Sequence, residues 1–282
     1  LTVHIPRNPV GSAAEVAAMI AEFHPVARVY IGLKQLKIFS FGPRPFDFLT
    51  CHAPIKPLFD IGVEIMENSE LDMYDIYLSK KGDPRIKSVA SDMAKELGKG
   101  NMYPDLLEPL AQFEIALLDF MEKNLGASKS AVFANKCWPS FEKYFGFVPC
   151  FINSRLATHG IPISCESDIY GALSEYIAVC ATEIPAAILD INNTVPQDMY
   201  QESKAAIGQY TNNDLFMGFH CGNTSSACML SFTMKYQLIM RRLMEHGKQP
   251  DITCGTLEGT LKSGAATVTE TPSSFSSMPS WS

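Results

Sequence analysis

The chain has 282 residues and carries 23 Lys or Arg against 30 Asp or Glu, which gives a net charge of −7. Its 46% hydrophobic and 19% charged residues are typical of a folded globular protein and exclude a disordered chain. The acidic balance argues against a nucleic-acid-binding protein, and no uninterrupted apolar run reaches the ~18 residues of a membrane helix, so we expect neither a nucleic acid nor a membrane as partner.

Helices and strands are predicted in alternation along most of the chain. Ser12 and Glu15 have the spacing of a helix capping box, which predicts a helix at 12–23, and Pro25 is expected to end it. Strands are predicted, in chain order, at 26–31, 63–65, 130–134, 162–165, 185–189 and 216–219. Helices are predicted at 55–59, 69–79, 83–98, 104–124, 139–144 and 167–180. The alternation favours an α/β fold with a Rossmann-like parallel sheet.

Eight cysteines are spread along the chain without any Cys-x-x-Cys pair. Their low density and apolar neighbours argue against a disulfide scaffold and favour a role as small buried hydrophobic residues. The start of the sequence shows no basic segment followed by an apolar one, as a signal peptide would. We therefore expect a cytoplasmic protein with reduced cysteines.

Three polar residues, Glu166, Asp190 and His220, each follow a short apolar segment of β character. In parallel α/β sheets ligands bind beyond the carboxyl ends of strands, so these side chains could share one crevice. Two carboxylates and an imidazole make a ligand set suited to Mn²⁺ or Mg²⁺. Each residue also has a structural interpretation. Glu166 could cap the helix predicted after it, Asp190 could belong to a turn, and His220 could be a core histidine.

The motifs of several common enzyme classes are absent from the sequence. It contains no Gly-x-Ser-x-Gly elbow, no Walker loop and no Gly-x-Gly-x-x-Gly fingerprint. Hydrolases, nucleoside triphosphatases and dinucleotide-dependent enzymes therefore have no motif support.

Several short segments, taken in order, resemble parts of the L-fucose isomerase / L-arabinose isomerase family. The acid-centred stretch ISCESDIYGAL at 163–173 contains Glu166, and AILDI at 187–191 contains Asp190. The spacing of these two acids agrees with that of L-fucose isomerases. The other similar segments are ENSEL at 67–71, ANKCWP at 134–139, GFHCGN at 218–223 and the hairpin-like 255–269. The resemblance covers about residues 26–269.

The resemblance implies an aldose–ketose isomerase that works through a metal-bound enediol. A carboxylate can take a proton from one sugar carbon and return it to the neighbouring carbon. A divalent cation that chelates both oxygens stabilises the charge of the enediolate. By resemblance, Glu166 and Asp190 would be metal ligands and the proton-transfer pair, with either as the base. His220 is the candidate for the third ligand of Mn²⁺ or Mg²⁺.

Three further residues are candidates for contact with the sugar. Trp138 could stack on the apolar face of the sugar, and a core Trp is the equal alternative. Arg44 could meet a hydroxyl or an anionic substituent, whereas a structural role in its own Gly-Pro-Arg-Pro loop is the alternative. Asn223 ends the GFHCGN segment and is counted with them.

Full-length members of the family are longer than this chain. The resemblance implies a middle α/β domain at 1–182, the beginning of a C-terminal domain at 183–270 and a poorly ordered Ser-rich tail at 271–282. For a full-length protein it also implies a homo-oligomer, a trimer or hexamer, in which each site borrows the N-terminal domain of a neighbour. A chain without that domain is expected to bind metal and sugar poorly.

Two other functions remain open at this point. One is a non-catalytic relative of the same fold that binds a carbohydrate or a partner. The other is a different metal-dependent sugar enzyme, such as an aldolase or an epimerase. The dependence of the melting temperature on Mn²⁺ and the nature of the products would separate them.

Overall fold

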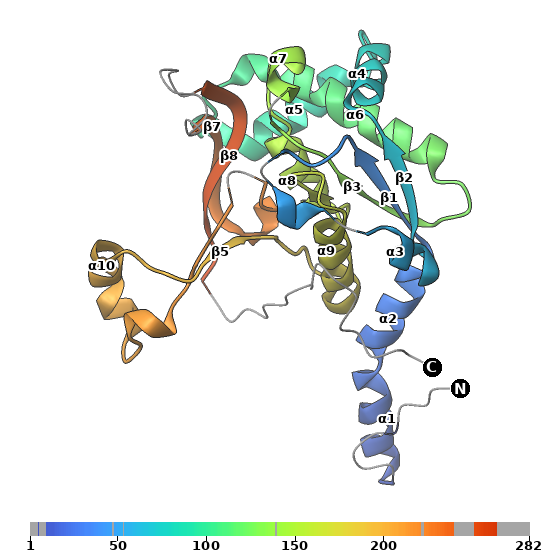
Figure 1. Cartoon of the computed structure of the whole chain (residues 1–282), viewed down its shortest axis with the longest axis vertical. Coiled ribbons are helices and arrows are strands. Elements are labelled where there is room, and N and C mark those ends of the chain that lie inside the picture. Colours follow the sequence, from blue (N-terminus) through green and yellow to red (C-terminus); the bar gives the residue numbers. More distant parts are fainter. Residues whose placement is uncertain are drawn as a thin grey trace.

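A computed structural model describes residues 5, 10–46, 48–52, 54–138, 140–220, 223–239 and 251–263, without the side chains of 237–239 and 251–253. Its centre is a four-stranded parallel sheet with helices on both faces (Figure 1). In spatial order the strands are β2 (Glu64–Asn68), β1 (Leu36–Phe41), β3 (Ser130–Ala134) and β4 (Ile163–Ser164). The expected α/β fold with a parallel sheet is confirmed.

The α-helices are α1 (Ala13–Glu22), α2 (His24–Leu33), α3 (Lys56–Asp60), α4 (Glu70–Ser79), α5 (Ile86–Leu97), α6 (Leu107–Asn124), α7 (Phe141–Phe145), α8 (Cys150–Thr158), α9 (Ile169–Thr182) and α10 (Gln197–Ile207). Single 3₁₀ turns lie at Leu49–Cys51, Gly98–Gly100, Pro104–Leu106, Asn212–Asp214 and Ser226–Cys228. The capping box predicted at the start of the first helix is present, because the Ser12 side chain accepts from the Glu15 amide and the Glu15 carboxylate accepts from the Ser12 amide.

Strand β1 divides the interior into two apolar layers, since its side chains alternate between the two faces of the sheet. Phe39 and Phe41 pack with α4, α5, α6 and α8 in the larger layer. Leu36 and Ile38 pack with α3 and α9 in the smaller one. All four side chains are at most 1% exposed. This complete burial on both faces is typical of a central parallel strand and fixes the edge at which all four strands end.

The strand predicted at 26–31 is wrong, because these residues belong to helix α2. As predicted, the first helix ends just before Pro25, because α1 runs to Glu22. Pro25 itself lies in the first turn of α2, where its missing N–H has no helical partner to lose. The helix is held from outside: Arg28 donates from Nε to Cys180 O (2.8 Å) and from Nη2 to Ala181 O (2.6 Å) at the end of α9. Packing against α9 therefore overrides the β-rich local composition.

The apolar segment 185–189 is not a strand, contrary to the prediction. Regular structure begins at Asp190, the first residue of β5 (Asp190–Asn192), which pairs antiparallel with β6 (Met217–Phe219). A second antiparallel pair joins β7 (Met229–Ile239) and β8 (Asp251–Leu261). Strand β8 lies against the N-terminus of α8, where the Val148 amide donates to Cys254 O (2.8 Å). The tail expected at 271–282 lies outside the described residues.

Helices α1 and α2 form one apolar stretch, Ala13–Leu33, that extends away from the sheet (Figure 1). Within the described residues it is the one helical stretch long and apolar enough to cross a membrane, with a mean hydropathy of 1.3 and none of it buried. Core helices of soluble proteins and signal sequences can have the same length and apolar composition. The stretch is not an uninterrupted apolar run, because His24, Pro25 and Arg28 interrupt it. The prediction from the sequence, which rested on an uninterrupted run, therefore missed it.

Candidate active site

The loops that follow β1, β3 and β4 meet at the carboxyl edge of the sheet. Ser167 ties them together, because its amide donates to Asn135 O (2.8 Å) and its hydroxyl donates to Phe41 O (3.1 Å). Trp138, three residues beyond Asn135, lies half-buried on the β3 loop. The position that the sequence predicted for ligand binding is therefore a real convergence of loops from three strands.

Glu166 sits on that edge in an unusual backbone conformation. Its φ is 57° and that of Ser167 is 54°, so two consecutive non-glycine residues lie in the left-handed region. Such a conformation costs about 1–2 kcal/mol per residue and persists only where surrounding contacts enforce it. The hydrogen bonds of Ser167 and the bond from the Asp168 amide to Cys165 O (3.0 Å) supply that enforcement. The backbone thus holds Glu166 in a fixed turn directly after β4.

Asp190 and His220 are brought together by the β5–β6 pair. Asp190 lies opposite Phe219, the residue before His220. The amide of Asn223 donates to His220 Nδ1 (3.2 Å), and the Asn223 side chain donates from Nδ2 to Ile163 O of β4 (2.8 Å). Asn223 is therefore a buried link between the His220 turn and the central sheet. Asp190 begins an antiparallel strand, so it does not occupy the end of a parallel strand as the sequence suggested.

Two further acids, both missed from the sequence, lie close to this region: Glu175 is buried and Asp168 is half-buried. Burial raises the pKa of Glu175 on α9 to about 8, although nearby His220 and the Ile188 amide oppose the shift. Burial also raises the pKa of Asp168. A sequence signal was available, because Glu175 lies on the same face of α9 as the buried Ala172 and Tyr176, where a charged residue is unusual.

The pKa of the Cys51 thiol is affected by the same acids. Burial, with the charges of Asp168 and Glu166, raises its pKa to about 12. The turn that carries Cys51 therefore lies near the end of β4, and the surroundings of its thiol are acidic and partly shielded from solvent. Low solvation strengthens every charge interaction made there.

The raised pKa of Glu175 predicts a dependence of stability on pH. The folded protein keeps a proton up to about pH 8 that the unfolded chain releases near 4.5. The free energy of unfolding should therefore fall as pH rises between these values, by about 5 kcal/mol at most. Urea unfolding at pH 5, 6.5 and 8 should show the slope in the wild type and lose most of it in Glu175→Gln. The exposed Glu202→Gln on α10 is the matched control, and an unchanged slope in Glu175→Gln would contradict the assignment.

Arg44 and Lys136 bring positive charge to the loops that follow β1 and β3 at this edge. Lys136 is buried, donates from Nζ to Pro43 O (2.9 Å) and pairs with Glu70 Oε2 (3.0 Å). Arg44 donates from Nη1 to the carbonyls of the two residues that follow it (3.0 and 2.8 Å). Its Nε is buried and has no hydrogen-bond partner among the described residues. Arg44 therefore holds its own loop through Nη1, while the N–H at Nε is left to donate to another group.

A cavity of about 540 Å³ lies between the β5–β6 pair and the β7–β8 hairpin. Its lining includes His220 and Thr224 from one side and Tyr236 and Glu258 from the other. The volume is in the range of small-molecule sites. Glu166, Asp190 and Trp138 are not among its lining residues, so the cavity meets the candidate site at His220 alone.

The described part of the chain holds no group of three or more His, Cys, Asp or Glu side chains arranged to bind a metal ion. Glu166, Asp190 and His220 are chemically suited to Mn²⁺ or Mg²⁺ but are not gathered around one point. In addition, His220 Nδ1 accepts a hydrogen bond, whereas a metal-bound imidazole normally donates from its second nitrogen. In the described part of the chain these three side chains therefore do not form a metal centre.

Comparison with known proteins points to sugar isomerases, although no family model matches the chain. The sulfoquinovose isomerase of Alkalicoccus urumqiensis is 29% identical over 149 residues, which are 51% of this chain and 32% of the relative. That of Clostridium sp. (strain MSTE9) is 28% identical over 183 residues, 62% of the chain and 39% of the relative. That of Priestia megaterium is 27% identical over 153 residues, 54% of the chain and 33% of the relative.

The chain thus spans between 32% and 39% of the length of these relatives. The similarity supports the expectation of a sugar isomerase at the level of reaction class. None of these relatives is named an L-fucose or L-arabinose isomerase. The comparison therefore does not show the L-fucose/L-arabinose isomerase type.

Proposed function

We propose that the chain belongs to an aldose–ketose isomerase of the L-fucose/L-arabinose isomerase type. The similarity to sulfoquinovose isomerases over about half of the chain carries this proposal. Two features of the site support it: Glu166 is fixed at the carboxyl edge of a parallel sheet, and two acids with raised pKa values, Asp168 and Glu175, lie in the same region. Isomerisation of this kind moves one proton between adjacent carbons and needs a carboxylate base near both.

Glu166 and Asp190 are the proposed proton-transfer pair. Glu166 is held by the rigid turn after β4, and the exposed Asp190 lies on the β5–β6 pair beside His220. A base must lie within about 3 Å of the proton it removes, so the proposal requires the two acids to approach the same sugar. We propose that His220 contributes to the same site, and that Mn²⁺ or Mg²⁺ binds when these three residues come together.

The relatives and Arg44 support a proposal for the substrate class. The relatives are named for sulfoquinovose, a sugar that carries a sulfonate group. We propose that this chain also takes an aldose with an anionic substituent, and that the unused donors of Arg44 meet that group. Guanidinium groups bind oxyanions through charge-assisted hydrogen bonds worth about 1.5–3 kcal/mol.

Arg44→Met should therefore lower kcat/KM for a sulfonated aldose by about 10- to 100-fold, mainly through KM. The neutral aldose without the sulfonate is the internal control and should change by less than about threefold. Steady-state kinetics on both sugars check this. An equal loss on both sugars would instead assign Arg44 to its loop alone.

The reaction itself is tested by product analysis in D₂O. The chain is incubated with neutral and sulfonated aldoses, with and without Mn²⁺, and the sugars are followed by NMR. Proton transfer through an enediol predicts a ketose with deuterium at C1, because the base exchanges with solvent. Cleavage products would identify an aldolase and a C2 epimer an epimerase, and either would overturn the proposal.

Carbohydrate binding without turnover is the second candidate function. The cavity of about 540 Å³ favours it, since Tyr236 offers an aromatic face and Thr224 and Glu258 offer polar groups. Calorimetric binding of an aldose that is not converted, unaffected by Mn²⁺, would support this function. Tyr236→Ala should then abolish binding, whereas Glu166→Gln should not.

A further inference from the structure

Two cysteine sulfurs face each other at the carboxyl edge of the sheet. Cys165 follows β4 directly, and Cys137 lies on the loop after β3. The Cys165 thiol donates to Cys137 Sγ at a distance of 4.0 Å. Cys165 is 2% exposed, whereas Cys137 is half-buried and reachable from solvent.

The backbone already holds these two residues in a fixed relation. Strands β3 and β4 are neighbours with Ala134 opposite Ser164, and the Asn135 amide donates to Ser164 O (3.0 Å). A disulfide needs the sulfurs at about 2.05 Å, so they must approach by about 2 Å. Side-chain rotation and a small shift of the β3 loop can supply this movement, because the paired strands need not move.

We propose that Cys137 and Cys165 form a modification site, which two-electron oxidants of the peroxide class convert to a disulfide. The Cys137 thiolate attacks hydrogen peroxide, whose O–O bond breaks to leave a sulfenic acid and one hydroxide. Cys165 then attacks the Cys137 sulfur, the S–O bond breaks, and the S–S bond forms. Two thiols lose two electrons and two protons in all, and one peroxide becomes two waters.

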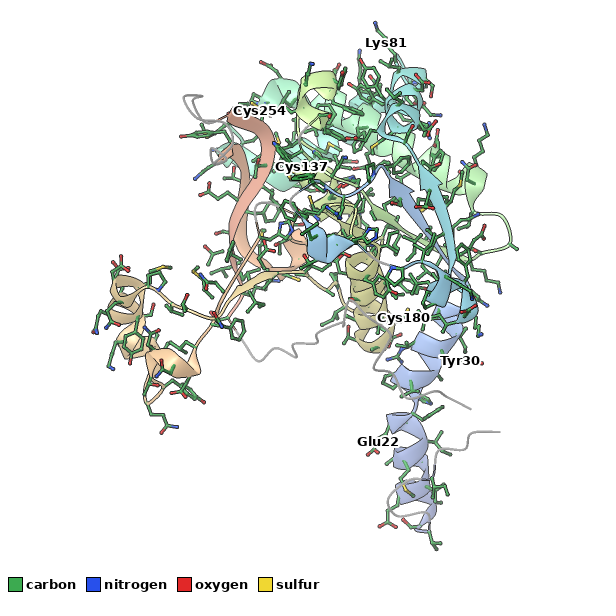
Figure 2. All side chains as sticks on the ribbon, in the orientation of Figure 1. Glu22, Tyr30, Lys81, Cys137, Cys180 and Cys254 are labelled. Carbon is green, nitrogen blue, oxygen red and sulfur yellow. The ribbon has the colours of Figure 1, made fainter. Side chains whose placement is uncertain are left out.

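The surroundings favour this pair over Cys51 and Cys180. Cys51 also lies near Cys165, but its raised pKa of about 12 keeps it in the unreactive thiol form. Burial likewise raises the pKa of Cys180 on α9, which lies well away from Cys137 in Figure 2. Cys137 combines access to solvent with a sulfur neighbour. This inference does not depend on the proposed function.

The bridge would have a local structural effect at the candidate site. Glu166 and Trp138 each directly follow one of the two cysteines. A disulfide would therefore fix the distance between the β3 and β4 loops. Closing a loop of 28 residues should also raise the melting temperature of the oxidised protein.

The test is disulfide mapping of the native chain after treatment with hydrogen peroxide at pH 8, which increases the thiolate fraction. The oxidant is removed with catalase, the protein is alkylated in denaturant, and its peptides are analysed by mass spectrometry. The proposal expects loss of two of the eight alkylatable thiols and one cross-linked peptide joining Cys137 to Cys165. The matched control Cys180→Ser should give the same cross-link, and Cys137→Ser and Cys165→Ala should give none.

The wild-type peptide map decides the matter even if a variant fails to fold. Alkylation of both Cys137 and Cys165 after oxidation of other thiols would overturn the proposal. A disulfide between Cys165 and Cys51 would also overturn the proposal. The same holds if the cross-linked mass assigned to Cys137 and Cys165 is still found in Cys137→Ser.

Discussion

Glu166→Gln should lower kcat for aldose–ketose conversion by about 10²- to 10⁴-fold, which is the usual contribution of a positioned general base. Glutamine keeps the size and hydrogen-bonding capacity of the side chain but cannot accept the proton from the sugar carbon. KM should change little, since ground-state contacts survive. Initial rates of ketose formation from the converted aldose provide the measurement.

Glu67→Gln is the matched control for this variant. Glu67 is an exposed acid near the carboxyl end of β2, the strand at the opposite edge of the sheet from β4, and its replacement should leave kcat unchanged. The free energy of unfolding of Glu166→Gln should stay within about 1 kcal/mol of the wild type, because the left-handed turn is held by backbone contacts. Full turnover in Glu166→Gln would remove Glu166 from the proton-transfer role.

Local signals predicted the elements that surround Glu166. The predicted strand at 130–134 coincides with β3, and the predicted helix at 167–180 corresponds to α9. Both have strong local features, namely a continuous apolar run and a helical apolar face. A polar residue directly after an apolar strand then placed Glu166 at the carboxyl edge, and the structure has it there.

Features that depend on contacts distant in sequence could not be predicted in this way. Strand β1 was missed because Lys37 and Ser40 interrupt its apolar pattern, yet both are buried through partners elsewhere. Asp190 was placed after a strand, whereas its own strand begins there and Asp190 finds its antiparallel partner, Phe219, 29 residues later. Glu175 belongs to no motif, and its only signal in the sequence was its place on the apolar face of α9; the burial that raises its pKa comes from the assembled fold.

A second large effect is expected at a buried ion pair on the far side of the sheet from α9. Arg155 of α8 donates from Nε to the two oxygens of Glu96 (3.1 and 2.9 Å) and from Nη1 to Glu114. The side chains of Arg155 and Glu114 are 10% and 6% exposed. Arg155→Met should lower the free energy of unfolding at pH 7 by about 3–5 kcal/mol, because it leaves the Glu114 carboxylate buried without its partner. Urea unfolding monitored by circular dichroism checks this value.

The double variant Arg155→Met/Glu114→Leu separates two contributions to the loss of stability, namely the lost ion pair and the cost of burying an unpaired carboxylate. If the unpaired charge is the main penalty, the second substitution should restore most of the stability, because apolar residues can often replace a buried ion pair without loss of stability. Burial raises the pKa of Glu114 even with Arg155 present. In Arg155→Met that pKa should rise further, so the folded variant keeps its proton where the unfolded chain has lost it. The variant should therefore lose stability as pH rises from 5 to 7, and an equal deficit at both pH values would show that lost packing of the Arg155 side chain dominates.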